Sequence, residues 1–145
     1  MKKGRLFMIV GALLAIGAVY YLSEPGYRKD ARVFAQYVRS NRHKYDAIKE
    51  WGTSLPINHT GAFQEVSHVQ WSDTVKQLSY RNWRSPSYVL ARGDPRTLVL
   101  VYGGGLGHWG LIIDMSGSGH LEEFAGDFLL KIDDIYTVWW DLQQN

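Results

Sequence analysis

The longest uninterrupted apolar stretch of the chain runs over 6–22 and contains no charged residue. As a helix it would extend about 25 Å at about 1.5 Å per residue, close to what a bilayer core of about 30 Å requires. A basic tail with Lys2, Lys3 and Arg5 precedes it, and the aromatic pair at 20–21 suits the headgroup region at its far end. The pattern predicts a transmembrane signal anchor over 6–22 after a tail over 1–5.

The basic tail also predicts the orientation of this anchor. The positive-inside rule places the N-terminus in the cytoplasm and the rest of the chain across the membrane, although Arg28, Lys29 and Arg32 weaken the bias. A cleaved signal peptide is the main alternative, but bulky residues around position 21 stand where cleavage needs small ones. A lipoprotein anchor would require cysteine, and the chain has none.

Small residues recur on one face of the predicted anchor. Gly11, Ala15 and Ala18 are spaced by four and three residues, so they share a helical face. Such faces let two membrane helices approach closely. The spacing therefore indicates that the chain could form a homodimer within the membrane.

After the anchor, apolar residues recur at helical spacing as far as about residue 51. Ser23 can cap a helix whose first turn tolerates Pro25, and Gly52 is expected to end the helical segment. The pattern predicts either one helix or two helices with a break near 40–41. The apolar positions on which this depends are Ala31, Phe34, Val38, Tyr45 and Ile48.

The next segment is less regular. Residues 56–71 give no clear helical or strand pattern. Thr74 and Gln77 have capping-box spacing, which predicts a short helix there. Val75 and Leu78 would form its apolar edge.

From residue 87 the pattern changes to that of β-strands. The run over 97–102 is apolar on both faces, which predicts a central strand, and the short turn over 93–96 pairs it antiparallel with 88–92. The fold class is therefore predicted as α+β, a helical segment packed on an antiparallel meander of about four or five strands. We expect residues 23–145 to form one soluble domain with this fold. The predicted strands are 88–92, 97–102, 108–114, 128–132 and 135–142.

Composition and charge narrow the function classes. Hydrophobic residues make up 46% of the chain and aromatic residues 14%, which favours a folded domain. The absence of cysteine excludes thiol catalysis and thiolate metal sites. Positive charge dominates 24–96, with twelve basic and seven acidic residues, whereas 97–145 has one basic and seven acidic residues. No nucleic-acid motif accompanies this split, so we expect no nucleic-acid partner.

A glycine-rich run over 103–110 is the sharpest motif. Gly105, Gly107 and Gly110 satisfy the dinucleotide-binding spacing, but the residues that follow have a strand pattern instead of opening a helix. No phosphate-loop lysine follows either. The run therefore predicts a β connection without a nucleotide or other cofactor. Gly105 and Gly107 could let a ligand or a partner's backbone approach closely.

His108 is the strongest single candidate for chemistry. Strand alternation directs it away from the face that Trp109 shares with the core, and its partner must come from elsewhere in the chain. An alternative function, a small histidine-dependent hydrolase or metal-dependent enzyme, would use His108 with His59 or His68. The histidines lack a recognised metal-ligand spacing, so no metal site and no catalytic residue is assigned.

The adjacent tryptophans Trp139 and Trp140 are a further candidate for binding. Neighbouring strand residues point to opposite faces, so one ring is expected in the core and the other outward. Exposed aromatic surface often marks an interaction site. We therefore predict a single-pass membrane-anchored binding or accessory module whose partners are the bilayer, a protein at the membrane and a second copy. Its candidate ligand-binding or partner-binding residues are Gly105, Gly107, His108 and Trp140.

Overall fold

The computed structural model describes residues 15–16, 18–19, 24–58, 61–81, 85–103, 107–117, 121–124 and 126–142. The chain divides into two compact units, Met1–Asp30 and Ala31–Asn145. Of the predicted anchor over 6–22, only Ala15, Ile16, Ala18 and Val19 are described, and all four are helical. Gly11 and the rest of the span lie outside the described residues. Within the described residues, no helix is long and apolar enough to cross a membrane.

Two helices form the helical segment of the fold, as one of the two predicted alternatives has it. Helix α2 (Gly26–Ser40) and helix α3 (Arg42–Ser54) are separated at Asn41. The Asn41 backbone N–H and its side-chain amide both donate to the Tyr37 carbonyl, each over 3.0 Å. These hydrogen bonds satisfy a backbone carbonyl in the last turn of α2, where the chain changes direction between the two helices.

The prediction that Gly52 ends this segment is wrong, because α3 continues to Ser54. A Cβ atom at Gly52 would lie 3.1 Å from the Met115 sulfur and 3.3 Å from a Leu98 methyl carbon. The glycine therefore serves close packing of α3 on the sheet instead of ending the helix.

The short helix α4 (Asp73–Lys76) begins two residues earlier than the capping box at Thr74 and Gln77 predicts. Ser72 is its N-cap, and the Ser72 hydroxyl accepts a hydrogen bond from the Val75 N–H over 3.3 Å. Val75 and Leu78 are buried, as predicted. The 3-10 helix η1 (His68–Gln70) precedes α4.

Within the part of the chain that the structure describes, the sheet has six antiparallel strands in the order β1-β2-β3-β4-β6-β5, so the predicted count of four or five is corrected. The additional strand β1 is short and polar, and only its backbone pairing with β2 reveals it. Strand β3 is central and fully buried, as predicted. The strands are β1 (Gln64–Glu65), β2 (Tyr88–Arg92), β3 (Thr97–Gly103), β4 (His108–Asp114), β5 (Phe128–Lys131) and β6 (Tyr136–Trp140).

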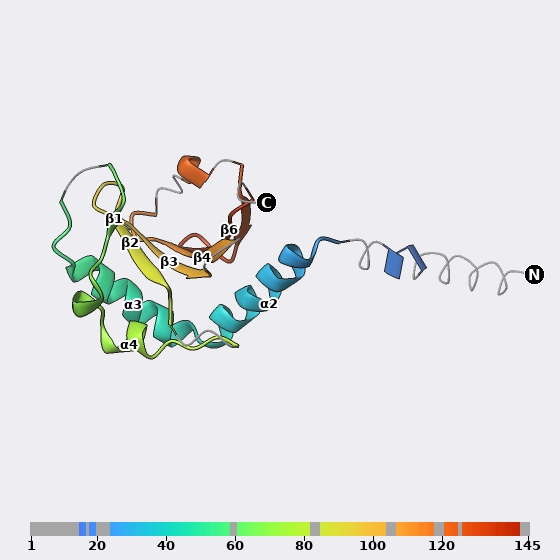
Figure 1. The fold of residues 1–145 in the computed structure, drawn as a ribbon, viewed down its shortest axis with the longest axis horizontal. Helices are drawn as coiled ribbons and strands as arrows, with labels where there is room; N and C mark the ends of the chain where they lie inside the picture. The colour runs from blue at the N-terminus through green and yellow to red at the C-terminus, as the bar shows by residue number, and fades with distance from the viewer. Residues whose placement is uncertain are drawn as a thin grey trace, which may run out of the picture. The chain divides into compact units, whose positions relative to one another are not determined.

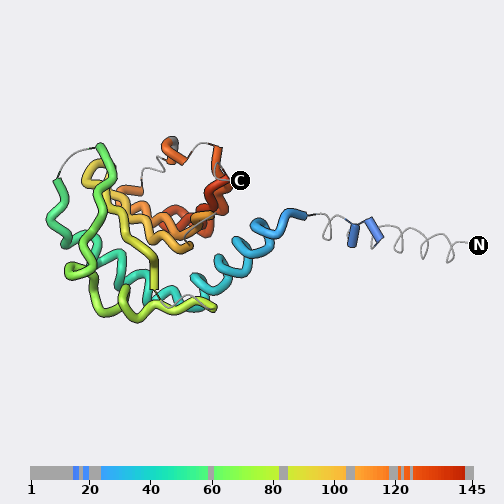
Figure 2. The backbone as a smooth tube through the Cα atoms, viewed as in Figure 1, coloured from blue at the N-terminus to red at the C-terminus, as the bar shows by residue number. Residues whose placement is uncertain are grey.

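The strand order also departs from a simple meander. Strand β4 pairs with β6, and β5 lies beyond β6 at the end of the sheet. The connection from β4 therefore returns along the sheet through η2 (Glu122–Phe124) before β5 begins, as the orange part of the tube in Figure 2 shows. Sequence pattern cannot distinguish this arrangement from a meander, because both require the same alternation along each strand.

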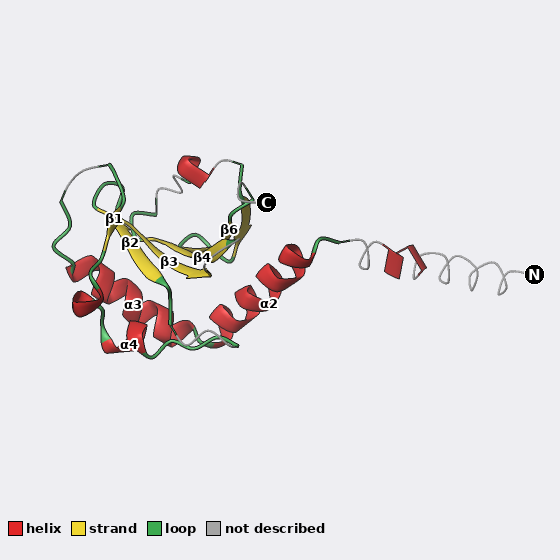
Figure 3. Ribbon diagram, in the orientation of Figure 1, coloured by secondary structure: helices red, strands yellow, loops and turns green. Residues whose placement is uncertain are grey.

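Hydrophobic residues pack against both faces of the sheet. Figures 1 and 3 show α3 and α4 on one side of the sheet. One face is covered by buried residues of α2, α3 and α4, as predicted for an α+β fold. The other face carries a smaller core in which Phe63, Leu121 and Phe124 pack around Ile112 and Trp139. Both faces of the central strands are therefore shielded from water.

Candidate binding site at the aromatic end of the sheet

Four neighbouring strands each contribute one aromatic residue to a continuous row on the helix-covered face. Tyr102 pairs with Trp109, Trp109 pairs with Trp140, and Trp140 pairs with Phe128. The Tyr102 and Trp109 ring centroids are 4.8 Å apart, and those of Trp109 and Trp140 are 5.6 Å apart, both nearly parallel. We call these four residues the aromatic row.

Exposure rises along this row from one end to the other. Tyr102 is fully buried and Trp109 is 8% exposed, whereas Trp140 and Phe128 are only half-buried. Phe34 of α2 covers the buried end, with its ring centroid 4.9 Å from that of Trp109. The row therefore presents a partly exposed end whose inner rings are held in place by packing.

The two consecutive tryptophans lie on opposite faces, as strand alternation predicts. Trp139 is 8% exposed and belongs to the smaller core. Its indole N–H donates to the Asp127 carboxylate over 2.7 Å, and its ring lies 5.6 Å from that of Phe124. Trp140 is the half-buried member of the pair and packs against the larger core on the helix-covered face.

An ionic cluster fixes the β5–β6 hairpin, which carries Trp140, to α3. Arg42 donates to the carboxylates of both Asp46 and Asp133, and its guanidinium lies 4.3 Å from the centre of the Tyr136 ring. The Tyr136 hydroxyl donates to Asp46 over 2.7 Å. This hydrogen bond, followed by the interaction with Arg42, lowers the pKa of the Asp46 carboxyl below its ordinary value.

Asp133 anchors the turn of the same hairpin. Burial opposes its ionisation, but hydrogen bonds from the backbone N–H groups of Tyr136 and Ile135, together with Arg42, lower the pKa of the Asp133 carboxyl. Burial and the Asp46 hydrogen bond raise the pKa of Tyr136, so its hydroxyl stays a proton donor at neutral pH. The hairpin is therefore held through side-chain as well as backbone contacts.

Glycines bring the backbone close together at the same end of the sheet. Gly103 has a φ of +95°, and a Cβ atom there would lie 2.4 Å from the Gly107 carbonyl oxygen. A Cβ atom at Gly110 would lie 1.9 Å from the Leu100 carbonyl oxygen. Strand β4 continues through Gly110, so the nucleotide-binding fingerprint lacks its helix, as predicted. Gly105 lies outside the described residues.

His108 begins β4 at this end, on the face opposite the aromatic row. It is half-buried, its ring centroid is 5.9 Å from that of Tyr88, and its carbonyl accepts the Asp141 N–H over 2.9 Å. Burial, and then the negative charges of Asp141 and Glu65, raise the pKa of Tyr88. The structure thus identifies two neighbours of His108 that the sequence could not.

Three of the four predicted site residues meet at one end of the sheet. Gly107 and His108 lie at the start of β4, next to Trp109, whose cross-strand neighbour is Trp140. Sequence reasoning missed Phe128 and Tyr88, which border the same end. Alternation assigns each of them a face but leaves open which strands are neighbours.

The histidines that the alternative enzymatic function would use do not share one contact in the structure. His68 packs on Trp71, with ring centroids 4.6 Å apart, whereas His108 lies beside Tyr88. His59 lies outside the described residues. Among the side chains that the structure describes, no group of three or more His, Cys, Asp or Glu residues could hold a metal ion.

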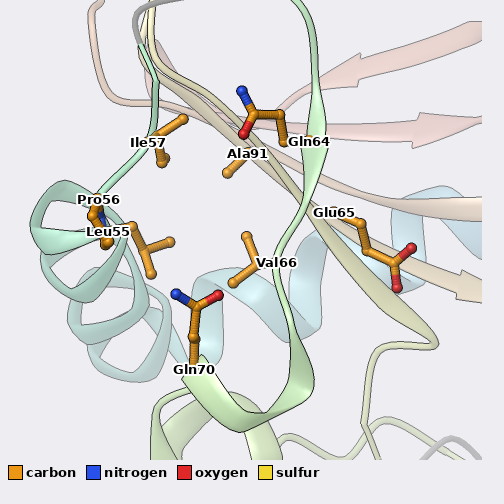
Figure 4. A pocket seen from close by; sticks show the side chains of 8 residues that line it. All are labelled: Leu55, Pro56, Ile57, Gln64, Glu65, Val66, Gln70 and Ala91. Atoms are coloured by element: carbon orange, nitrogen blue, oxygen red, sulfur yellow. The ribbon is translucent and has the colours of Figure 1, made fainter.

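A separate small cavity of about 60 Å³ lies between the end of α3 and the β1–β2 edge. Figure 4 shows Val66 and the Gln70 amide directed toward this space, whereas the Glu65 carboxylate points away from it. The Trp51 indole donates to the Gln70 carbonyl over 3.2 Å and ties this wall to α3. The cavity is large enough for a few atoms only, and none of the predicted site residues lines it.

Comparisons of the chain with protein-family models, with curated proteins and with solved structures found no match.

Proposed function

We propose that this protein is a binding or accessory module, held at the membrane by the apolar run over 6–22, and that it binds a partner protein through the aromatic end of its sheet. The observation that carries the proposal is the half-buried Trp140 ring stacked on the buried Trp109 ring. Tryptophan offers a large contact area with few torsions to restrict, and it is enriched among residues that dominate binding energy.

The surroundings of Trp140 support the same function. Phe128 extends the apolar surface by one strand, and Asp141 follows Trp140 directly with a negative charge. An apolar centre bordered by charged groups is the usual arrangement of a protein interface. The acidic C-terminal half of the chain would favour a partner with basic residues around an apolar contact.

The membrane part of the proposal is supported by the sequence pattern. The basic tail and the uncharged run over 6–22 place the N-terminus in the cytoplasm and the folded domain on the other side. The bilayer is then the first partner, and a protein at the membrane surface is the second. Helix pairing through Gly11, Ala15 and Ala18 remains a prediction.

The alternative function, a small hydrolase, has one supporting observation. His108 and Asp141 are backbone neighbours at the start of β4, next to the Tyr88 ring. A hydrolase also needs a nucleophile aligned with the imidazole. The Ser87 hydroxyl, directly before β2 at the same end of the sheet, donates its hydrogen bond to the Gly103 carbonyl over 2.7 Å. Partner binding is therefore the better-supported function.

The test compares two half-buried tryptophans in the full-length chain. Trp140→Ala removes the half-buried ring stacked on Trp109, and Trp51→Ala is the matched control on α3. After mild cross-linking in membranes, we expect Trp140→Ala to reduce recovery of the same co-purified protein at least about tenfold, because dominant interface residues contribute about 2 kcal/mol or more. Recovery should be nearly unchanged in Trp51→Ala.

Equal recovery with both variants would contradict a role for the aromatic end. Circular dichroism of each purified variant shows whether the fold persists, so that loss of binding can be separated from unfolding. Deletion of 1–22 in the same assay separates a partner bound by the folded domain from one bound by the anchor.

A further inference from the structure

Strand β5 forms one end of the described sheet and pairs on one side only, with β6. The Ile132 N–H donates to the Tyr136 carbonyl over 2.9 Å, which marks a hydrogen-bonded pair just beyond the strand. Because such pairs alternate along an antiparallel ladder, Leu130 and Phe128 also bond inward to β6. The N–H and C=O groups of Leu129 and Lys131 therefore point away from the sheet.

The residues of this edge are mostly apolar. Phe128, Leu129 and Leu130 are each half-buried, and only Lys131 is well exposed, with 66% of its side chain accessible. Proteins usually prevent unwanted pairing of an edge strand with several charges, a proline or a bulge. This edge has one lysine and no proline. It is therefore suited to pairing with another strand.

We propose that the occupant of this edge is the β5 strand of a second copy of the chain, paired antiparallel about a two-fold axis at Leu129. Leu129 would exchange both backbone hydrogen bonds with its counterpart. Two six-stranded sheets would then form one continuous sheet. This proposal concerns the sheet edge and does not depend on partner binding at Trp140.

Charge complementarity selects this register. In the Leu129-centred arrangement, Lys131 lies opposite Asp127 of the second copy, and the same pairing recurs across the axis. On the other face, Phe128 lies opposite Leu130 of the second copy. Each Lys131, which already forms an ion pair with Asp134 of its own copy over 2.8 Å, then also faces a carboxylate of the second copy, and apolar residues meet apolar residues.

Registers shifted toward the C-terminal end of β5 place like charges together. Hydrogen-bond alternation allows shifts of the axis by one residue along the strand. An axis at Leu130 would set Asp127 against Asp133 of the second copy, and an axis at Lys131 would set the two lysines against each other. Like charges directly opposite are destabilising in antiparallel pairs.

Asp127 is positioned to receive the lysine. Its carboxylate accepts the Trp139 indole N–H over 2.7 Å, which holds it on the same face of the sheet as Lys131. The Asp127 N–H already donates a hydrogen bond to the Phe124 carbonyl over 3.0 Å within its own chain. The Asp127 carbonyl is the group that would accept the Lys131 N–H of the second copy.

The absence of native cysteine allows a direct test by disulfide formation. Hydrogen-bonded antiparallel pairs have Cα atoms about 5.5 Å apart, within the range that a disulfide bridges. Single-cysteine variants Leu129→Cys, Leu130→Cys and Lys131→Cys are made in the full chain, and each is oxidised mildly in detergent micelles. Lys76→Cys, at an exposed position on α4, measures random collision.

We expect Leu129→Cys to yield at least about five times more covalent dimer than Lys76→Cys, and more than the other two variants. Strongest cross-linking at Leu130→Cys or Lys131→Cys would overturn the register. Yields equal to that of Lys76→Cys at all three edge positions would overturn the dimer.

A charge reversal checks the reason for the register without altering the cysteine. Adding Lys131→Glu to the Leu129→Cys chain sets a glutamate against Asp127 of the second copy, so the covalent dimer should fall several-fold. Lys76→Glu in the same background is the matched control and should leave the yield unchanged. An unaltered yield with Lys131→Glu would show that this ion pair does not hold the copies together.

Ala15→Leu in the Leu129→Cys chain separates the proposed sheet contact from pairing of the N-terminal helix. The covalent yield should persist in this variant if β5 supplies the contact. Loss of the yield to the collision level would show that the N-terminal segment alone brings the copies together.

Discussion

Trp109 lies between Tyr102 and Trp140 in the aromatic row and contacts several other aromatic rings. Its ring is stacked on Tyr102 and Trp140 and is met edge-on by Phe34. Directly beside it, Gly110 permits a backbone approach that any Cβ would block. A large ring next to an obligatory glycine explains why the sequence reads Trp-Gly at this point of β4.

Trp109→Ala should lower the free energy of unfolding by about 3–5 kcal/mol, the usual cost of removing a large buried aromatic ring. Urea unfolding of the full chain in mild detergent measures this. Trp51→Ala serves as the comparison, because Trp51 is only half-buried and should cost less. Equal losses in the two variants would show that the aromatic row is not a rigid part of the core.

At the scale of elements, helix α3 and the β5–β6 hairpin are joined by the cluster of Arg42, Asp46, Asp133 and Tyr136. Both carboxyl groups of this cluster have a lowered pKa in the folded state. A carboxyl whose pKa is lower folded than unfolded contributes stability above its unfolded pKa, near 4, and loses that contribution as the pH falls through the folded value. The cluster should therefore weaken in acid.

Asp46→Asn should flatten the fall in stability between about pH 5 and pH 2, because one of the two titrating carboxyl groups is removed. The Asp46 side chain is 44% exposed, so solvent screening limits its contribution to about 1 kcal/mol or less at neutral pH. Thermal unfolding of both proteins across this pH range measures the difference. Parallel curves for the two proteins would show that Asp46 does not titrate with folding.

At the scale of the whole molecule, the division into Met1–Asp30 and Ala31–Asn145 separates the N-terminal segment from the unit that holds both hydrophobic cores. Every residue of those two cores lies within the second unit. The folded part of the protein should therefore not need the apolar run over 6–22 for its own stability.

Deletion of 1–22 should release a folded protein into the soluble fraction, because this deletion removes the apolar run and none of the described core. Fractionation of cells followed by circular dichroism of the truncated chain measures both properties. An insoluble or unfolded truncated chain would contradict the division into an anchor and an independent domain.

The sequence by itself determined the α+β fold class, a helical segment before the sheet, the central position of 97–102 and the opposite faces of Trp139 and Trp140. These features depend on local periodicity, which side-chain order along the chain records directly. Periodicity also identified His108 and Trp140 as candidates.

Only the tertiary structure decided the strand order, the role of Gly52 and the neighbours of His108. It also showed that β5 ends the sheet and that Phe128 completes the aromatic row. Each of these depends on which distant segments pack together, and the same alternation along a strand is compatible with many partners. For this reason the sequence could name Trp140, whereas the row beneath it became visible only in the folded chain.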